Sequence, residues 1–363
     1  MKQPNQLEEA RQQINRLDAD LARLFEERMA AVDQVLAYKA AHNLPVFDPE
    51  REQQVLRANL DRLQNPALRP YFQQFLQDFM NISKDYQLAE LKKNTVAFAG
   101  ADGAFAAQAA KTLFPTYNYH ICLDFESVFQ EILEQKAAYG VIPFENSYTG
   151  EVGEVFDLLY KHSCHIQQFW DFPIRQNLLA LPQAKLSGLR KVYSHPQALS
   201  QCADFIQAYA LEPVPYANTA MAAQFVAQSG DPTLAAIASA ESARLYGLDI
   251  LAANINSSSQ NTTRFIVIAR ELKPQGSRFN LMFTVNHNAG QLARVMSTIG
   301  DLGFNMESIK SRPMKSLPWQ YYFYVEIEGR LDSPQAQELL DKLKSSCEIL
   351  KVLGSYDLRR LDS

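Results

Sequence analysis

The chain has 363 residues, of which 47% are hydrophobic and 21% are charged. This composition is typical of globular proteins, and the length favours two or three domains. A formal charge of −5 leaves no excess of cations to release counterions from nucleic acid, so nucleic-acid binding is not expected. No apolar run approaches the roughly 20 residues of a membrane span, and the N-terminus lacks the apolar stretch of a secretory signal. We therefore expect a cytoplasmic protein without a membrane partner.

The cysteines and histidines indicate no metal or redox centre. Four scattered cysteines form no CxxC pair, so we expect reduced and mostly buried thiols. The run from His162 to His165 is the only local cluster of metal-type ligands, and it lacks a second ligand pair. We expect no metal and no cofactor.

The sequence changes character twice, which predicts three modules. Residues 1–92 contain no glycine and are rich in helix-forming residues. Residues 95–271 alternate strand-like and helical stretches, which predicts an α/β module. A linker at 273–277 precedes residues 278–363, whose strand–helix–strand–strand–helix–strand order is typical of a ferredoxin-like α+β unit. The strands expected in that unit are 279–285, 304–312, 320–328 and 347–355, and its helices are 290–302 and 333–345.

A heptad pattern in the first module carries one charged residue on its apolar seam. The a positions are Leu7, Ile14, Leu21, Arg28 and Val35, and the d positions are Ala10, Leu17, Leu24, Ala31 and Tyr38. A helix over about 7–40 would be roughly 50 Å long, which exceeds the diameter of a ninety-residue globule. Further helices expected at 49–64 and 67–92 cannot cover it, so we expect a dimer that shares the long helices.

Several cations converge on this seam. Arg28 on its own could pair with a carboxylate or reach solvent with its charged end. However, Lys39 follows eleven residues later on the same face, and Arg11 flanks the seam. A buried cation without a partner costs several kcal/mol. The convergence therefore predicts a site for a small acid with two negative charges.

Polar residues at helical spacing follow in the next two helices. Asp48 precedes a proline, which is a good helix start, and Arg51 and Glu52 share its face. Ser83 and Gln87 lie one turn apart in the third helix. These residues could form solvated polar faces, and Asp48 could serve as a helix cap whether or not it has another role.

Together with the seam cations, these residues resemble the all-helical chorismate mutases over the whole first module. The resemblance implies an intertwined dimer that rearranges chorismate to prephenate. It implies that Arg28 and the partner subunit's Arg11 bind the two carboxylates, and that Lys39 and Gln87 donate to the ether oxygen.

The hydroxyl side of chorismate would be held by Asp48, Glu52 and Ser83, and Arg51 would add positive potential. The residue types fit the reaction. A pericyclic rearrangement needs positioning of the substrate and stabilisation of the negative charge that grows on the ether oxygen, and it needs no nucleophile.

Four segments of the middle module together resemble prephenate dehydratase over about 95–270. They are Gly100 to Phe105, Ile142 to Ser147, Tyr193 to Cys202 and Asn261 to Phe265. The first is too short for a dinucleotide fingerprint, and the neighbours Ser194 and His195 do not make a hydrolase triad. The resemblance implies two α/β lobes like those of type II periplasmic binding proteins, at about 95–171 plus 265–271 and at 172–264, with the site in the cleft.

The implied reaction removes CO2 and the ring hydroxyl from prephenate. Hydroxide is a poor leaving group, so a donor must assist it, and the resemblance gives that role to Thr263. Arg264 would anchor a carboxylate or form an ion pair within the hinge. Glu145 could be structural, because an acid repels a dianion unless it is paired. The other implied cleft residues are Asn146, Ser147, Ser194, Gln201 and Phe265.

The first segment departs from the family, since Ala104 and Ala106 replace a small hydroxyl residue and a serine. This departure motivates an alternative in which the module decarboxylates prephenate without making it aromatic. The intact run from Thr263 to Phe265 argues against that alternative.

The last module resembles an ACT domain, a regulator that binds phenylalanine between paired copies. The matching positions are Gly290, Leu292, Ser311, Arg312 and Pro313, whereas Gln291 and Lys310 replace the family's Ala and Glu. The module would sense phenylalanine, or it would only dimerise.

The sequence thus predicts a bifunctional enzyme that converts chorismate through prephenate to phenylpyruvate, with phenylalanine as feedback inhibitor. A homodimer or a dimer of dimers is expected. A catalytically silent amino-acid sensor is the alternative from another class, and the full set of mutase residues argues against it.

Overall fold

The computed structural model describes residues 6–42, 44–258, 260–315, 317 and 319–360. The chain divides into two compact units, Met1–Asn94 and Thr95–Ser363. Among the described residues, no helix combines the length and the apolarity that crossing a membrane requires.

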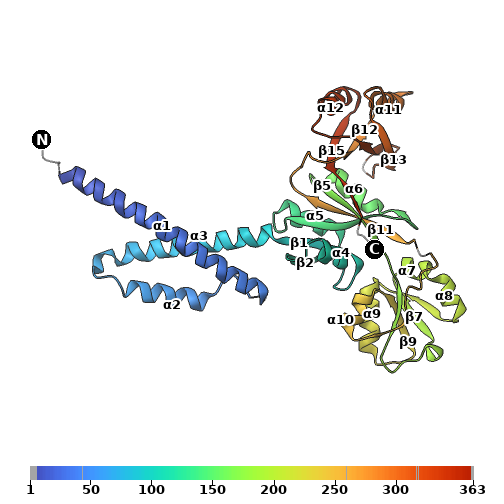
Figure 1. The fold of residues 1–363 in the computed structure, drawn as a ribbon, viewed down its shortest axis with the longest axis horizontal. Coiled ribbons are helices and arrows are strands. Elements are labelled where there is room, and N and C mark those ends of the chain that lie inside the picture. The colour runs from blue at the N-terminus through green and yellow to red at the C-terminus, as the bar shows by residue number, and fades with distance from the viewer. Residues whose placement is uncertain (1–5, 43, 259, 316, 318, 361–363) are drawn as a thin grey trace. The chain divides into compact units, whose positions relative to one another are not determined.

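The first unit is helical, as predicted (Figure 1). Its described elements are α1 (Gln6–Ala41), α2 (Pro49–Leu60), the 3-10 turn η1 (Pro66–Leu68) and α3 (Arg69–Lys93). Asp48 is the N-cap of α2, and its carboxylate accepts a hydrogen bond from the backbone N–H of Arg51 at 2.9 Å. The helix ends at Leu60 rather than at residue 64. The Asn65–Pro66 pair that follows disfavours helical backbone.

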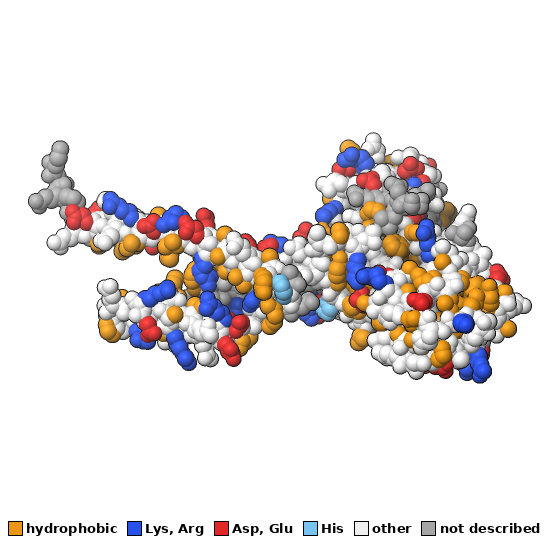
Figure 2. Space-filling view, turned by 60° about the horizontal axis from the view of Figure 1, so that its bottom comes forward, with side chains coloured by type: hydrophobic (Ala, Val, Ile, Leu, Met, Phe, Trp, Pro, Cys, Tyr) orange, Lys and Arg blue, Asp and Glu red, His pale blue; other side chains and the backbone are white. Residues whose placement is uncertain are grey.

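The apolar seam of α1 is exposed within one chain. Leu17 and Tyr38 are 60% and 61% exposed, and Leu7, Ile14, Leu21, Leu24 and Val35 are exposed as well. Figure 2 shows apolar side chains along the protruding part of this helix. The helices α2 and α3 therefore leave most of the seam uncovered.

The second unit contains two sheets among its described residues. The larger has the strand order β13-β14-β12-β15-β5-β11-β3-β1-β2. Its dehydratase-like part consists of β1 (Thr95–Ala99), β2 (Asn118–Cys122), β3 (Tyr139–Asn146), β4 (Gly150–Glu151), β5 (His165–Pro173) and β11 (Thr262–Ala269), with α4 (Phe105–Leu113), α5 (Phe125–Leu133) and α6 (Gly153–Lys161). β11 runs antiparallel between β3 and β5, so it joins chain segments that are far apart in sequence.

The smaller sheet has the order β10-β6-β9-β7-β8. Its elements are β6 (Asn177–Ala180), η2 (Leu186–Gly188), β7 (Lys191–Ser194), α7 (Pro196–Gln201), α8 (Ala203–Ala208), β8 (Glu212–Pro215), α9 (Thr219–Ser229), β9 (Leu234–Ala238), α10 (Ala240–Tyr246) and β10 (Asp249–Ala252). The chain leaves the larger sheet after β5 and re-enters it at β11. The predicted α/β fold is therefore confirmed.

The rest of the larger sheet comes from the C-terminal part of the chain. Its elements are β12 (Arg278–Thr284), α11 (Gln291–Asp301), β13 (Asn305–Pro313), β14 (Tyr321–Glu328), α12 (Pro334–Ser346), β15 (Ile349–Tyr356) and β16 (Leu358–Arg360). One face of these strands is covered by α11 and α12, where Val325 and Ile327 are buried. The opposite face carries Tyr322 and Tyr324 into the core of the dehydratase-like part. This face therefore packs directly on the α/β fold.

Candidate active sites

Arg28 is one of the half-buried cations of the first unit. Its Nη1 donates to Ser83 Oγ at 2.5 Å, and its guanidinium carbon lies 4.2 Å from the centre of the Phe79 ring. Burial lowers the pKa of Arg28, and no carboxylate of the described residues opposes that shift. The alternative of a seam arginine paired with a carboxylate therefore does not hold within the described chain. The guanidinium retains donors for an anion.

Ser83 and Gln87 are buried one turn apart on α3, at 4% and 7% exposure. Ser83 Oγ donates to the Phe79 carbonyl at 2.9 Å, so it accepts the bond from Arg28. Gln87 Nε2 donates to the Ser83 carbonyl at 3.2 Å, while Gln87 Oε1 is buried without a partner among the described residues. A buried amide oxygen without a partner calls for an explanation, such as a ligand or a water that completes its hydrogen bonds.

The remaining predicted mutase residues surround the start of α2. Lys39 Nζ donates to the Val46 carbonyl at 2.7 Å and fixes the loop that leads to the cap residue. Glu52 forms an ion pair of 2.9 Å with Lys84 of α3, a partner that the sequence spacing did not indicate. Arg51 is exposed. Glu52 therefore links α2 to α3, whether or not it also contacts a ligand.

Arg11 does not join Arg28 within one chain. It precedes Arg28 by seventeen residues on the same helix, a distance of about 25 Å along the axis. Arg11 is exposed, and its nearest carboxylate, at 4.0 Å, belongs to Glu8. A role for Arg11 at the same site needs a second copy of the chain.

Thr263 and Asn146 meet where β11 pairs with β3. Asn146 Nδ2 donates to Thr263 Oγ1 at 2.9 Å, and both side chains are buried. A hydroxyl that accepts from an amide keeps its own hydrogen for another acceptor. Thr263 is therefore arranged as a hydrogen-bond donor, which the departure of a hydroxyl group requires.

The orientation of the Asn146 amide is fixed from both ends. Its Oδ1 accepts from the backbone N–H groups of Tyr148 and Thr149 at 3.0 and 3.1 Å. Its Nδ2 also donates to Asn261 Oδ1 at 2.9 Å. Asn261 was part of a predicted segment but not a predicted site residue. Its separation of 115 residues from Asn146 gave no local signal.

Arg264 forms a bidentate ion pair with Asp171. Nε and Nη2 of Arg264 lie 2.7 and 3.1 Å from the two carboxylate oxygens. The hydrogen bonds to Asp171 raise the pKa of Arg264 above its ordinary value, against the effect of burial. Of the two roles expected for Arg264, the ion pair between β5 and β11 is the one present.

The other predicted cleft residues occupy different environments. Ser194 is fully buried and donates to the Ile237 carbonyl at 2.6 Å. Phe265 is 2% exposed and packs edge-on against Phe172 in the core. Gln201 is buried on α7, whereas Ser147 is exposed. Ser194 and Phe265 therefore support the surrounding structure, and their contact with substrate stays a prediction.

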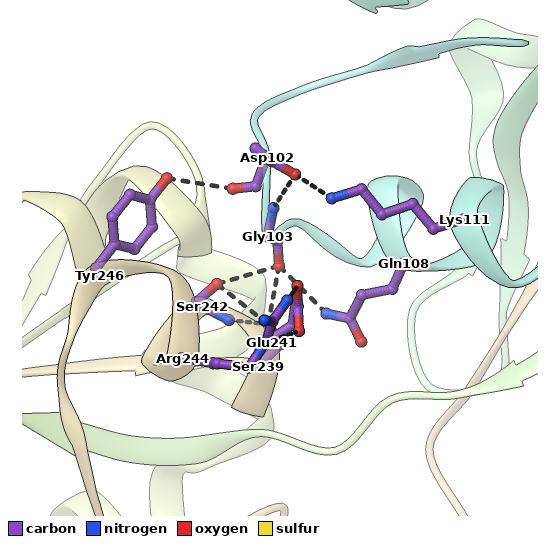
Figure 3. A network of polar contacts seen from close by, with 9 residues as sticks. All are labelled: Asp102, Gly103, Gln108, Lys111, Ser239, Glu241, Ser242, Arg244 and Tyr246. Atoms are coloured by element: carbon purple, nitrogen blue, oxygen red, sulfur yellow. Dashed lines mark hydrogen bonds and ion pairs between the residues drawn. The ribbon is translucent and has the colours of Figure 1, made fainter. Parts of the chain in front are cut away.

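The glycine segment joins the two sheets of the second unit (Figure 3). The Gly103 carbonyl accepts hydrogen bonds from Ser239 Oγ at 2.8 Å and from Ser242 Oγ at 3.1 Å. Gly103 has a φ of 87°, and a Cβ there would lie 2.9 Å from Ser242 Oγ. Both observations require glycine at this position. The segment thus holds the start of α4 against the start of α10.

Ala104 is the N-cap residue of α4, and it makes no side-chain cap hydrogen bond. Ala106 lies in the first turn of the same helix. A hydroxyl residue at position 104 could cap the helix. The departure from the family pattern at Ala104 therefore removes a helix cap.

The predicted effector residues lie around α11 and β13. Gly290 is the N-cap of α11 with a φ of 81°. Leu292 lines a cavity of about 260 Å³ together with Tyr321 and Phe323. Ser311 pairs with Phe323 across the strands β13 and β14. The structure therefore brings the start of α11 and one face of this strand pair to the same cavity.

The thiols are mostly buried, as predicted: Cys122, Cys164 and Cys202 are buried, and Cys347 is half-buried. Burial raises the pKa of Cys202 to about 12. In the part of the chain that the structure describes, no group of three or more His, Cys, Asp or Glu side chains could hold a metal ion.

Two family models match the chain, chorismate mutase type II over residues 10–88 and prephenate dehydratase over residues 96–273. The bifunctional chorismate mutase/prephenate dehydratase of Aquifex aeolicus (strain VF5) is 34% identical over 97% of this chain and 98% of that protein. The Neisseria gonorrhoeae protein of the same name is 33% identical over 95% of each chain.

Solved structures resemble the second unit. A protein described as GqqA, a novel type of quorum-quenching acylase, has a TM-score of 0.67 and 29% identity over 73% of this chain and 98% of its own. A prephenate dehydratase from Arthrobacter aurescens in complex with L-Phe has a TM-score of 0.67 and 24% identity over 73% and 90% of the two chains. The second likeness shows the fold. Because the matches to the bifunctional proteins span nearly the whole length of both chains, this chain belongs to the bifunctional chorismate mutase/prephenate dehydratase family.

Proposed function

We propose that residues 1–92 carry the chorismate mutase activity, residues 95–271 the prephenate dehydratase activity, and residues 278–363 an ACT domain that senses phenylalanine. The two activities together convert chorismate to phenylpyruvate. The mutase assignment rests on Arg28, a half-buried cation without a carboxylate partner among the described residues. The dehydratase assignment rests on the hydrogen bond from Asn146 to Thr263.

In the mutase site, Arg28 would bind one carboxylate of chorismate while Ser83 holds its guanidinium in place. Lys39 and Gln87 would donate to the ether oxygen, on which negative charge grows as the C–O bond breaks. Turning the Gln87 amide over exchanges the positions of its oxygen and nitrogen and directs the donor outward. Donors held in place before the reaction stabilise that charge without reorganisation.

We infer that the mutase site is shared between two copies of the chain. The exposed seam of α1 is the apolar face that a second α1 would cover. The same pairing would bring the partner subunit's Arg11 to the second carboxylate of chorismate. Mutase activity should therefore depend on the dimer.

In the dehydratase site, Thr263 would donate a hydrogen bond to the departing ring hydroxyl of prephenate. The electron pair of the bond to the ring carboxylate moves into the ring as CO2 leaves. The ring becomes aromatic and hydroxide departs, stabilised by the hydrogen bond from Thr263 and neutralised by a proton from solvent. Asn146 would keep the Thr263 hydroxyl pointed outward, since it occupies the acceptor side of that oxygen.

A cavity beside Leu292 is the proposed phenylalanine site. Gly290 would present the N-terminal backbone of α11 to the carboxylate of the amino acid. Ser311 and Pro313 are exposed on the same face of β13, where a second copy could complete the site.

The test is a two-substrate assay on the full chain, with chorismate or prephenate supplied and phenylpyruvate measured, in the presence and absence of phenylalanine. We expect turnover of both substrates and inhibition by phenylalanine. A product that never becomes phenylpyruvate would favour a decarboxylase, and turnover of neither substrate would favour a silent sensor.

A further inference from the structure

The segment from Lys310 to Pro313 divides between the two faces of its sheet. Successive residues of a strand point to opposite faces, and directly paired residues point to the same face. Lys310 pairs with Tyr324, and Arg312 pairs with Tyr322. Both tyrosines belong to the core that the strands share with the dehydratase-like part. The two cations therefore face the dehydratase, away from the cavity beside α11.

Lys310 contacts the strand that carries Asn146. Its Nζ donates to Glu145 Oε1 at 2.6 Å, and its side chain is only 16% exposed. The ammonium group also lies 5.5 Å from the centre of the Phe156 ring. Glu145 immediately precedes Asn146 on β3. One ion pair and one peptide bond thus separate the C-terminal part of the chain from the amide that orients Thr263.

Arg312 contacts β4, the strand that forms a hairpin with β3. Its Nη1 lies 2.9 Å from Glu151 Oε1 on β4, and its Nε lies 3.3 Å from Asp157 Oδ1. Burial opposes the charged form, but the hydrogen bonds with Asp157 and Glu151 raise the pKa of Arg312 overall. A Cβ at Gly153 would collide with the guanidinium, so the backbone closes over this side chain. Arg312 is fully engaged by the dehydratase-like part.

The hairpin needs these cations because it places two acids opposite each other. Glu145 and Glu151 are directly paired across β3 and β4. Like charges in that position are destabilising. Glu145 points to the opposite face of β3 from Asn146, but an unpaired carboxylate one residue away would still repel prephenate, which carries two negative charges. The cations of β13 neutralise both glutamates.

We propose that Lys310 and Arg312 are positioning residues of the dehydratase reaction and not ligands of phenylalanine. This inference rests on the proposed dehydratase function. It gives Lys310 a role that depends on its positive charge, because a glutamate at this position would face Glu145. In this proposal, the replacement of the family's Glu by Lys310 does not alter the effector site, since Lys310 lies on the other face of the sheet.

The test uses Lys310→Gln, Lys310→Glu and the exchange Lys310→Glu with Glu145→Lys in the full chain. We expect Lys310→Gln to lower kcat/KM for prephenate about tenfold, mainly through KM, because it removes the ion pair between Lys310 and Glu145. Lys310→Glu should lower it further, and the exchange should recover most of the loss relative to Lys310→Glu. Added salt should reduce the Lys310→Gln defect by screening the exposed acid.

Two controls separate this role from a general loss of packing. Lys315 also pairs with the dehydratase-like part, through Asp157 at 2.9 Å, but its side chain is 80% exposed. Lys315→Gln should leave the dehydratase kinetics within about twofold, as expected for an exposed pair. Chorismate turnover by every variant should match that of the unmodified chain.

Calorimetry with phenylalanine decides between the two roles of Lys310. A positioning role predicts that Lys310→Gln still binds phenylalanine with little change in affinity. The inference is overturned if Lys310→Gln dehydrates prephenate normally, if it loses phenylalanine binding tenfold or more, or if the exchange is no better than Lys310→Glu. Absence of dehydration by the unmodified chain would instead refute the proposed function.

Discussion

Replacing Thr263 with valine is the most direct test of the dehydratase site. Valine keeps the β-branched shape of threonine, so the side chain still fits its buried position on β11. The substitution removes only the hydroxyl that accepts from Asn146 and is proposed to donate to the substrate. Catalysis and stability should respond to this change by very different amounts.

The stability effect should be small because Asn146 keeps other partners. Its Nδ2 also donates to Asn261 Oδ1 at 2.9 Å and to the Thr262 carbonyl at 3.2 Å. The buried amide is therefore not left unsatisfied, and the loss of one neutral hydrogen bond costs about 1 kcal/mol. Loss of a positioned proton donor, in contrast, lowers rates by roughly 10²- to 10⁴-fold. A large fall in kcat with a nearly unchanged unfolding midpoint is expected.

The assay is phenylpyruvate formation from supplied prephenate, with chorismate turnover measured on the same preparation. Thr262→Val is the matched control. Its Oγ1 makes one exposed hydrogen bond, to the Gln260 carbonyl at 3.3 Å. This control should retain dehydratase activity within about twofold, as expected for a surface substitution. A Thr263→Val enzyme with unchanged kcat would remove the hydroxyl from the mechanism.

Other substitutions address the mutase, a helix cap and a titrating carboxylate. Arg28→Ala should lower mutase turnover by roughly 10²-fold or more while dehydration of supplied prephenate continues, and near-normal mutase rates would refute the seam argument. Ala104→Ser should stabilise the chain by about 1 kcal/mol by capping α4, with Ala106→Ser as a neutral control, and unfolding midpoints measure both. Hydrogen bonds from Lys161 and, secondarily, from His162 lower the pKa of Glu126 from 4.5 to about 2. The folded state therefore gains stability from this carboxylate above its ordinary pKa and loses it as the pH falls toward 2. Glu126→Gln should be less stable than the unmodified chain at neutral pH, and unfolding curves of the two should converge in acid; a gap that persists there would contradict the assignment.

Local sequence patterns were sufficient to predict the helices and strands and to propose part of the mutase site. The cap at Asp48 follows from the proline after it, and the half-buried Lys310 and Arg312 of β13 alternate with exposed residues as strand periodicity requires. Arg28 could be found because it interrupts a heptad of apolar residues. In each case the signal lies within a few turns of one helix or a few residues of one strand.

Contacts between distant segments could not be predicted in this way. Lys84 pairs with Glu52 across 32 residues, and Lys310 pairs with Glu145 across 165. Strand alternation predicts that Ser311 points to the opposite face of β13 from Lys310 and Arg312. It does not predict which of the two faces packs against the dehydratase-like part. That choice depends on how Tyr322 and Tyr324 pack, which is a property of the folded unit.

The packing of β13 also bears on how an effector could reach the dehydratase. One face of the strand carries Ser311 beside the cavity proposed for phenylalanine, and the other carries Lys310 against Glu145. A ligand can shift an equilibrium only by its different affinity for the two states. Movement of one edge strand would satisfy this requirement, because it changes the cavity and the ion pairs with Glu145 of β3 and Glu151 of β4 together. A longer chain of contacts is not needed, since β13, which would line the effector site, also contacts Glu145, the residue before Asn146.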